Sequence, residues 1–379
     1  MNRQRLEEIL NNFPKLRIAV VGDFFLDKWL EIDRGLDELS VETNLTAYQV
    51  VAKRCYAGAA GTVLSNLVAL GTGKLYALGF IGDDGEGFEM QRLLRAQGVN
   101  TDHLHTSGQV MTPTYTKPVF RQENGLEETN RLDHKNTKPT PVDLEQKIID
   151  SIRQIVPQVD ALIALDQLTS EGYGVLTPRI RQELAKIGKE YPKLVLYADS
   201  RAFIRHFHNM VIKCNNIEAV KLFASAGAAG SRADGSVGGL AGSASSREDD
   251  SAGAANIPDI QKKAENFDEV KNCLLQLSKQ NGRPVFITCG SKGVLVKDEN
   301  DRPVLVPGIK LPPDTKIDIV GAGDSCTSGI VTTLSSGGTP EEAAFVGNLV
   351  ASVTIQVIGT TGTATPGQVL AAYDRYCNA

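Results

Sequence analysis

Short apolar runs that alternate with helical patterns constrain the fold of this chain most. The runs at residues 18–21, 161–165, 194–197 and 285–288 are mostly aliphatic, and stretches with helical periodicity separate them. Such short, continuous runs indicate strands buried on both faces, and their alternation with helices is typical of βα units around a mainly parallel sheet. With 379 residues and 41% hydrophobic content, the chain can bury a core of that size. The sequence therefore predicts an α/β fold.

Polar residues follow each of these four runs. They are Asp23, Asp166, Asp199 and the pair Cys289 and Gly290. In open α/β sheets ligands bind beyond the carboxyl ends of the strands, so these tips are expected to surround one crevice. Each tip taken singly also fits an ordinary turn.

Residues 317–326, with the sequence I-D-I-V-G-A-G-D-S-C, predict a strand that runs into a helix. Gly321, Ala322 and Gly323 lack bulky side chains, so an anion can approach their N–H groups at the start of the helix. Asp324 then lies in the first helical turn, where it can accept a proton from a hydroxyl that attacks phosphorus. Apolar positions 326, 330, 331 and 334 predict one buried stripe, with Ser and Thr on the other face. The alternative is that Asp324 only caps a helix.

Two other regions depart from the βα rhythm. Polar and apolar residues alternate at about residues 28–56 and 110–133, which predicts strands outside the main sheet that build a small β lid. Residues 225–256 are dominated by Ala, Gly and Ser, a composition that buries little apolar surface. We expect them to form a flexible insertion.

Composition bounds the cellular context. No apolar run is long enough to span a bilayer, and residues 1–8 are charged and lack the apolar stretch of a secretory signal, which predicts a cytoplasmic protein without a membrane partner. The six cysteines form no C-x-x-C pair, which argues against a zinc site or a disulfide framework. The net charge of −5 gives no support for nucleic acid as a partner.

Two motifs, found in order, carry a family resemblance. Residues 318–329 and the glycine-rich stretches 57–61, 67–71 and 79–87 resemble the signatures of the ribokinase-like (pfkB) carbohydrate kinases. The resemblance covers nearly the whole chain. It implies that residues 1–379 form one kinase domain, a three-layer α/β/α sandwich with a mainly parallel central sheet and a small β-sheet lid. It also implies transfer of phosphate from ATP, with Mg²⁺, to a sugar hydroxyl.

The resemblance assigns roles around the reacting groups. Asp324 would be the catalytic base and would also contact the substrate, while Gly321, Ala322 and Gly323 would form the anion hole. Asp27 and Gly58 would bind the sugar. For Asp27, the alternative is a residue of a turn or a strand end.

The resemblance also implies a nucleotide and metal side. The N-x-x-E pattern of Asn215 and Glu218 would hold Mg²⁺ through water, unless it is only a helix start. Other positions would line the nucleotide site: Thr288, Gly290, Gly293 and Asn348, with Gly359 and Gly362 in a loop over the adenine. Asn348 also fits a satisfied polar residue between helices. Some family members bind a monovalent cation such as K⁺, and Asp318 is the matching position.

Departures from the family pattern leave the substrate open. Ala57 and Gly61 stand where the family usually has Gly and Asn, and Ile319 replaces a residue that is usually smaller or Pro. A catalytically idle binding protein with a regulatory role and a nucleoside kinase are therefore alternatives to a sugar kinase.

Residues 22–29, 131–133 and 172–177 are similar to bacterial heptose 7-phosphate kinases within the family. A heptose 7-phosphate-like sugar is thus the first expectation for the substrate, ahead of fructose or ribose. Four cationic residues are candidates to hold a substrate phosphate or else are solvated surface groups: Lys117, Arg121, Arg131 and Arg201. The resemblance further implies a homodimer that forms through the lid, since paired lids cover their exposed strand edges.

Overall fold

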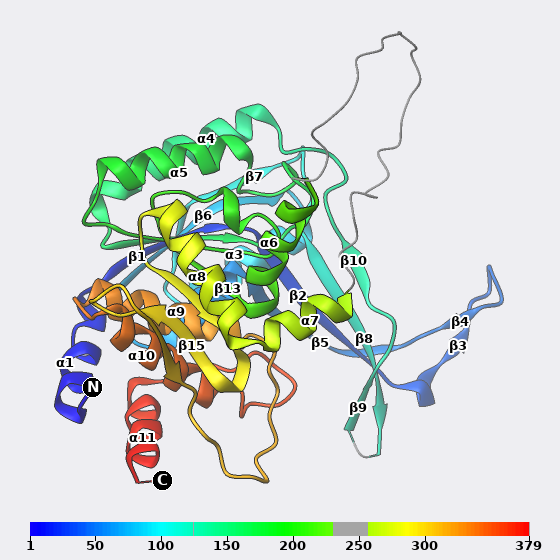
Figure 1. Ribbon diagram of the computed structural model, residues 1–379. Helices are drawn as coiled ribbons and strands as arrows, with labels where there is room; N and C mark the ends of the chain where they lie inside the picture. Colours follow the sequence, from blue (N-terminus) through cyan, green and yellow to red (C-terminus); the bar gives the residue numbers. More distant parts are fainter. Residues whose placement is uncertain (124, 230–256, 379) are drawn as a thin grey trace.

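A large central sheet organises the molecule. The structure, a computed structural model, describes residues 1–123, 125–229 and 257–378 (Figure 1). The sheet order is β16-β15-β14-β13-β12-β11-β1-β6-β7; all strands from β14 to β7 are parallel, and β15 runs antiparallel to both of its neighbours, β14 and β16. Its strands are β1 (Arg17–Gly22), β6 (Lys74–Gly82), β7 (Asn100–Ser107), β11 (Ala161–Asp166), β12 (Val195–Ser200), β13 (Val211–Asn215), β14 (Val285–Thr288), β15 (Gly293–Lys297) and β16 (Pro303–Pro307).

Helices cover both faces of this sheet. In β1, Ile18 and Val20 enter one core while Ala19 and Val21 enter the other, because successive side chains of a strand point to opposite faces. The first face carries α1 (Arg3–Leu10), α2 (Ala60–Ala69), α3 (Gly85–Ala96), α9 (Ala322–Ser335), α10 (Pro340–Thr354) and α11 (Pro366–Cys377). The second carries α4 (Val142–Ile155), α5 (Pro178–Glu190), α6 (Asn216–Ala229), α7 (Ile257–Glu265) and α8 (Phe267–Asn281). The predicted three-layer α/β/α architecture is confirmed.

A second, smaller sheet lies beside the main body. Its order is β10-β8-β2-β5, with β9 paired to β8, and β2 runs antiparallel to β5 but parallel to β8. The strands are β2 (Phe24–Ile32), β5 (Val50–Ala59), β8 (Thr114–Gln122), β9 (Gly125–Glu128) and β10 (Leu132–His134). They come from the two alternating regions, but β2 starts at Phe24 rather than near residue 28, because it follows β1 after Asp23 alone. The hairpin of β3 (Glu38–Leu39) and β4 (Thr46–Ala47) projects from this sheet (Figure 1).

One local expectation around α9 was wrong. The residues before it, including Ile317, Ile319 and Val320, form no strand and are exposed, because the segment pairs with no strand of the sheet and instead the Asp318 N–H donates to the Ile355 carbonyl. The Ser and Thr face of α9 is buried as well. Several of its hydroxyls bond to the helix backbone: the Ser328 hydroxyl, for example, donates to the Asp324 carbonyl at 2.9 Å.

The Ala, Gly and Ser-rich stretch is only partly described. Residues 225–229 are the last residues of α6, and residues 230–256 lie outside the described residues, so the insertion stays a prediction. Short 3₁₀ helices complete the chain: η1 (Phe13–Lys15), η2 (Arg34–Leu36), η3 (Val156–Gln158), η4 (Ile204–His206) and η5 (Gly290–Lys292). Among the helices of the described part, none has the length and apolar character needed to cross a membrane.

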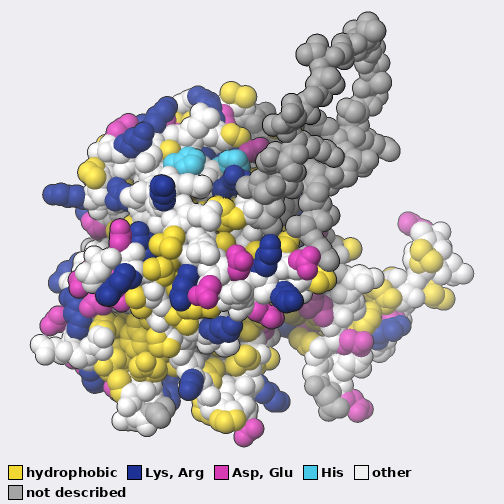
Figure 2. Space-filling view, viewed as in Figure 1, with side chains coloured by type: hydrophobic (Ala, Val, Ile, Leu, Met, Phe, Trp, Pro, Cys, Tyr) yellow, Lys and Arg dark blue, Asp and Glu magenta, His cyan; other side chains and the backbone are white. Residues whose placement is uncertain are grey.

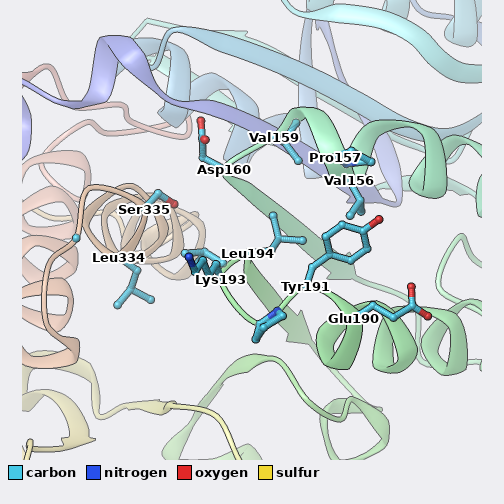
Figure 3. A pocket seen from close by; sticks show the side chains of 13 residues that line it. Val156, Pro157, Val159, Asp160, Glu190, Tyr191, Lys193, Leu194, Leu334 and Ser335 are labelled. Carbon is cyan, nitrogen blue, oxygen red and sulfur yellow. The ribbon is translucent and has the colours of Figure 1, made fainter.

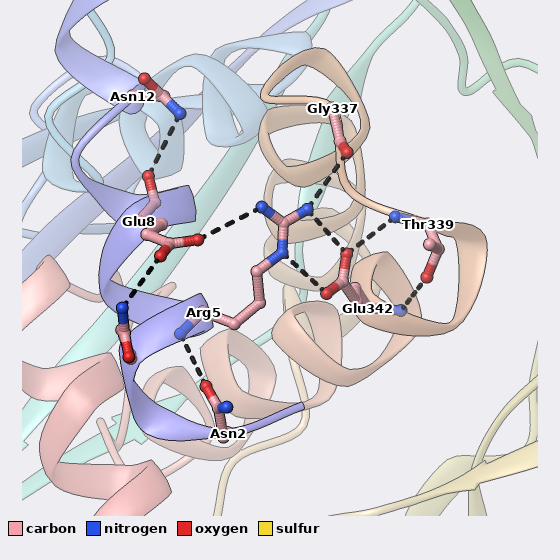
Figure 4. Close-up of polar contacts among 8 residues, drawn as sticks. Asn2, Arg5, Glu8, Asn12, Gly337, Thr339 and Glu342 are labelled. Atoms are coloured by element: carbon pink, nitrogen blue, oxygen red, sulfur yellow. Dashed lines mark hydrogen bonds and ion pairs between the residues drawn. The ribbon is translucent and has the colours of Figure 1, made fainter.

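An ion pair ties the N-terminal helix to the body. Arg5 of α1 meets Glu342 of α10 with 2.9 Å between Nε and Oε1, and its Nη2 donates to the Gly337 carbonyl at 3.2 Å (Figure 4). Glu342 also closes a capping box with Thr339 at the start of α10. The contact joins two helices of the same layer.

Candidate active site

The acidic strand tips lie on three neighbouring strands, as expected. Asp23 follows β1, while Asp166 and Asp199 end β11 and β12. The Asp23 carboxylate accepts the N–H groups of Gln167 at 3.1 Å and Val175 at 2.8 Å, so it holds the segment after β11. Burial and the charge of Asp23 raise the pKa of Asp166 to about 8. These two carboxyls therefore bind the segment that follows β11 and the last residue of β12.

Asp199 is engaged differently, because it pairs with a lysine that the sequence analysis missed. Lys213 of β13 is 5% exposed, and its Nζ lies 2.5 Å from Asp199 Oδ2 and donates to the Gly323 carbonyl at 3.3 Å. Burial opposes the charge, but Asp199 outweighs it and the pKa of Lys213 is raised. A lysine inside the otherwise apolar run 211–214 was the available signal.

The start of α9 matches the predicted anion site in part. Gly321 is the N-cap with φ 78°, and a Cβ there would lie 2.1 Å from Thr361 Cγ2, so glycine is required on both counts. The Ala322 N–H differs from the expectation, because it already donates to the Ile319 carbonyl at 3.1 Å. The N–H groups of Gly323 and Asp324 lie in the first turn, where a helix supplies no partner.

Asp324 lies in the first turn, as predicted, and is partly buried. Burial, together with the charges of Asp199 and Asp27, raises its pKa to about 7 against the opposing charges of Lys213 and Arg201. A carboxyl with a pKa near neutrality suits a general base better than an ordinary aspartate does.

Asp27 and Gly58 meet across two strands of the second sheet. Asp27 lies within β2, which removes the alternative of a turn or strand end, and a Cβ on Gly58 of β5 would lie 2.5 Å from Asp27 Oδ2. Burial raises the pKa of Asp27, while Lys117 and Arg131 lower it. Gly58 therefore provides the room that the Asp27 carboxylate occupies.

The departure at Gly61 has a packing reason. Gly61 is buried in α2, and a Cβ there would lie 2.5 Å from the Cβ of Ala57. A side chain at position 61 thus competes with the side chain at position 57. The two departures from the family pattern compensate each other in space.

Asn215 and Glu218 form a reciprocal cap at the start of α6. The Glu218 N–H donates to Asn215 Oδ1 at 2.8 Å, and the Asn215 N–H donates to Glu218 Oε2 at 2.7 Å. The helix-start alternative is therefore real. It leaves Oε1 of Glu218 outside this cap, and burial raises the pKa of the Glu218 carboxyl, with Asp199 adding to the effect. Asn215 pairs in register with Thr288 of β14, which brings two predicted nucleotide residues together.

Gly293 and Asn348 both contact β16. Gly293 has φ 113°, and a Cβ there would lie 2.1 Å from the Val306 carbonyl oxygen. The Asn348 side chain donates to the carbonyls of Val306 at 3.1 Å and Pro307 at 3.0 Å. Asn348 is thus satisfied within the fold, and the adenine contact stays a prediction. Gly290, with φ 58°, has open space beside it.

Asp318 joins two loops beside α9. Its carboxylate accepts the Val320 N–H at 3.0 Å and the Gly359 N–H at 3.2 Å. In the described ranges, no group of three or more His, Cys, Asp or Glu is placed to hold a metal ion. A metal would therefore depend on few side chains, such as Glu218, together with water or phosphate oxygens.

The predicted phosphate-binding cations differ in their surroundings. Arg121 pairs with Glu31 at 3.2 Å, and Arg131 pairs with Asp133 while its guanidinium lies 4.1 Å from the centre of the Tyr115 ring. Lys117 lies over the ring of Trp29 at 4.8 Å. Arg201 is exposed at the end of β12. Lys117 and Arg131 are the two whose charges reach Asp27.

A cavity of about 760 Å³ lies elsewhere, among Val156, Tyr191, Lys193 and Leu334 (Figure 3). It borders the first residue of β12, Val195, and the last turn of α9, at the opposite ends of both elements from Asp199 and Asp324. Ligands of α/β sheets bind beyond the carboxyl ends of strands, so this cavity is not the candidate active site.

Known proteins share both the sequence pattern and the fold. The pfkB family carbohydrate kinase description matches residues 17–223 and 251–366. The chain is 24% identical over 354 residues to the "Bifunctional protein HldE" of Gluconobacter oxydans, and 25% identical over 351 residues to that of Desulfatibacillum aliphaticivorans. These alignments cover 93% and 92% of the chain but only 63% and 61% of the relatives, so the chain spans less than two thirds of their length.

Two solved structures carry the comparison of the fold. Arabidopsis thaliana ribokinase, complexed with ribose and ATP, has a TM-score of 0.60 at 16% identity and covers 94% of this chain and 98% of its own. Ribokinase from Cryptococcus neoformans, in complex with ADP, has a TM-score of 0.56 at 19% identity and covers 95% and 99%. The predicted ribokinase-like fold is therefore confirmed. Because the family description matches most of the chain, including Asp324, this chain belongs to the pfkB family of carbohydrate kinases, phosphotransferases that act on a sugar hydroxyl.

Proposed function

We propose that this protein is an ATP-dependent kinase that phosphorylates a hydroxyl of a sugar or sugar phosphate, with a heptose 7-phosphate-like sugar as the first candidate and fructose or ribose next. One observation supports the proposal most. A Cβ on Gly321, at the start of α9, would lie 3.8 Å from Thr62 Cγ2 of α2, which directly follows β5, the strand that pairs with β2 and Asp27, and the charge of Asp27 is among those that raise the pKa of Asp324. The Asp27 carboxylate suits the recognition of a sugar hydroxyl, and the Asp324 carboxylate suits the deprotonation of that hydroxyl.

The residues act in a fixed order. The Asp27 carboxylate accepts hydrogen bonds from sugar hydroxyls, and Gly58 keeps the space that this carboxylate needs. Asp324 accepts the proton of the reacting hydroxyl as its oxygen attacks the γ-phosphorus of ATP. The N–H groups of Gly323 and Asp324 stabilise the charge that develops on the phosphoryl oxygens.

Metal ions complete the site in this proposal. Mg²⁺ neutralises phosphate charge when bound, and Glu218, with Asn215, would hold it through water. Asp318 would contribute to a K⁺ site beside the anion hole. ATP would lie along Thr288, Gly290, Gly293 and Asn348, since these residues share the β13 to β16 side of the sheet with Asn215.

The cationic residues near Asp27 favour a phosphorylated sugar. Lys117 and Arg131 both lower the pKa of Asp27, so their charges lie close to the proposed sugar site. Arg forms bidentate pairs with phosphate, and Lys adds a point charge. The charge of Arg201 lowers the pKa of Asp324, so this arginine lies near the proposed catalytic base.

Release of ADP with a panel of sugars, sugar phosphates and nucleosides tests the function. We expect turnover with a sugar phosphate and a drop of about 100- to 10,000-fold in kcat for Asp324→Asn. The exposed Asp143→Asn is the matched control and should retain activity. Equal turnover by the parent chain and Asp324→Asn would contradict the role of Asp324. Binding measured by calorimetry without turnover of any compound in the panel would instead favour the catalytically idle binding protein. Turnover with nucleosides alone would favour a nucleoside kinase.

The dependence of the rate on pH gives a second readout. A general base must be deprotonated in the free enzyme, and the pKa of Asp324 is about 7. We therefore expect kcat/KM to rise as the pH increases through about 7 and then to level off.

Assembly and location belong to the same proposal. The projecting hairpin exposes Leu39, Val41 and Leu45, and apolar side chains are visible along it in Figure 2. Exposed apolar side chains beside open strand edges favour a homodimer that forms through the second sheet. All six cysteines are free thiols, which suits the reducing cytoplasm.

A further inference from the structure

A buried ion pair lies directly beneath the first turn of α9. The side chains of Lys213 and Asp199 are 7% and 16% exposed, with 2.5 Å between Nζ and Oδ2. The free energy needed to remove two charges from water offsets much of their electrostatic attraction. A buried ion pair therefore does not by itself indicate a contribution to stability. Its contacts indicate another role.

The pair connects two strands to the helix that carries Asp324. Lys213 of β13 donates to the Gly323 carbonyl at 3.3 Å, and Asp199 of β12 accepts the Thr327 hydroxyl at 3.2 Å. The Thr327 hydroxyl also lies 3.4 Å from the hydroxyl of the buried Tyr197. Gly323 and Thr327 are one helical turn apart and lie on either side of Asp324 along the chain. Both ends of this turn are therefore bonded to the ion pair.

We propose that Lys213 and Asp199 are positioning residues that hold the first turn of α9, and with it the Asp324 carboxylate and the N–H groups of Gly323 and Asp324, in place for phosphoryl transfer. This inference rests on the proposed function of Asp324. Lys213 acts through the Gly323 backbone, and Asp199 through Thr327. Neither residue needs to contact the substrate.

The same pair controls the charge around Asp324. Asp199 and Asp27 raise the pKa of Asp324, whereas Lys213 and Arg201 lower it. Removal of the Lys213 charge leaves Asp199 uncompensated beside Asp324. The pH at which kcat/KM reaches half its plateau should then move upward, which a purely structural role for Lys213 would not cause.

Three variants test the proposal: Lys213→Met, Lys213→Arg and the double variant Lys213→Met with Asp199→Asn. We expect Lys213→Met to lower kcat about 100-fold, since a small displacement of a catalytic group has effects of that size. Lys213→Arg should recover part of the loss. The double variant leaves no unpaired buried charge, so it should regain thermal stability but not turnover.

Amide hydrogen exchange supplies a readout that needs no substrate. Peptides that cover residues 322–327 should exchange faster in Lys213→Met and in the double variant than in the parent chain. Arg5→Met is the matched control, because it removes another ion pair, whose arginine donates to the Gly337 carbonyl just beyond the other end of α9 (Figure 4). It should leave turnover and exchange of residues 322–327 unchanged.

The outcomes separate the two proposals. The positioning role would be overturned if the double variant had the kcat, pH profile and amide exchange of the parent chain. It would also be overturned if Lys213→Met had a lower Tm but an unchanged kcat, pH profile and amide exchange. Full turnover by Asp324→Asn would contradict the proposed function instead, and the exchange of residues 322–327 would still decide whether the pair holds α9.

Discussion

Four aspartates, three near the carboxyl ends of central strands and one at the start of α9, have different tasks because their neighbours differ. Asp23 accepts backbone N–H groups, Asp166 accepts the Ser200 hydroxyl at 2.9 Å, and Asp199 pairs with Lys213. Asp324 has a raised pKa and lies at a helix start. The chemistry of each carboxyl is thus set by its contacts and not by the residue type.

The Asp166 carboxyl makes the stability depend on pH. Its pKa is about 8 in the folded protein, raised from 3.8 by burial and by Asp23, so the folded state retains a proton that the unfolded chain releases. The free energy of unfolding should therefore fall as the pH rises from about 4 to about 8, by on the order of a few kcal/mol. Urea unfolding at pH 5 and pH 8 measures it.

The control for this prediction is a neutral amide at the same position. In Asp166→Asn the fall in unfolding free energy between pH 5 and pH 8 should be smaller, whereas the exposed Asp259→Asn should behave like the parent chain. The same pH slope in Asp166→Asn and in the parent chain would exclude this carboxyl as the cause.

At the scale of elements, pairs of strands and helices shape the site. Strands β2 and β5 place Asp27 beside Gly58, and α2 and α9 pack together, with the Ser328 hydroxyl 3.4 Å from the Val63 carbonyl. Ala59, the last residue of β5 and the N-cap of α2, has φ 52° and ψ −115°, a positive-φ conformation that is strained for alanine. The chain thus bends sharply between the strand that lines the sugar side and a helix that contacts α9.

Gly58→Ala tests the contact between β5 and Asp27. The new Cβ would lie 2.5 Å from Asp27 Oδ2, so the carboxylate must move. We expect the KM for the sugar substrate to rise about tenfold, equivalent to about 1.4 kcal/mol, with ADP affinity unchanged by calorimetry.

Gly367→Ala is the matched control for Gly58→Ala, because no atom lies within 4 Å of its Cβ position. A parent-like KM in Gly58→Ala would show that Asp27 either does not bind the sugar or tolerates displacement. Weaker ADP binding would instead place Gly58 on the nucleotide side.

At the scale of the molecule, the two sheets contribute different residues to the proposed site. The central sheet carries Asp199 and Lys213, which contact the start of α9, and the second sheet contributes Asp27 and Lys117, with Arg131 just before β10. The β3–β4 hairpin extends away from both (Figure 1). The side chain of Val41, between these strands, is fully exposed, which is unusual for a large apolar residue unless a partner covers it.

The dimer proposal gives a prediction at this scale. Leu39→Asp with Leu45→Asp should convert a dimer into a monomer in sedimentation at micromolar concentration, because charges would be buried in the interface. These side chains are 66% and 70% exposed, so the monomer itself should stay folded. Val142→Asp, equally exposed at the start of α4, should leave the dimer intact. A parent chain that sediments as a monomer would contradict the proposal.

Local sequence by itself determined much of this protein. The apolar runs predicted buried parallel strands, the small residues before Asp324 predicted a helix start, and polar alternation predicted the second sheet. These patterns depend on neighbours within a few positions, so they can be read without coordinates. The strand predicted for the mostly apolar residues 317–320 was wrong, because a strand also needs a neighbouring strand to pair with. Whether such a neighbour is present depends on the tertiary structure.

Only the tertiary structure decided which polar groups meet. Thr327 reaches Asp199 across 128 positions, and the burial that raises the pKa of Asp324 comes from segments distant in the chain. The Ala322 N–H donates to the Ile319 carbonyl, and the Asn348 side chain donates to the Val306 carbonyl of β16. Both bonds likewise depend on the tertiary structure. Hydrogen bonds and ion pairs act over a few ångströms, so strand register and helix packing determine them, and the residue pattern alone does not.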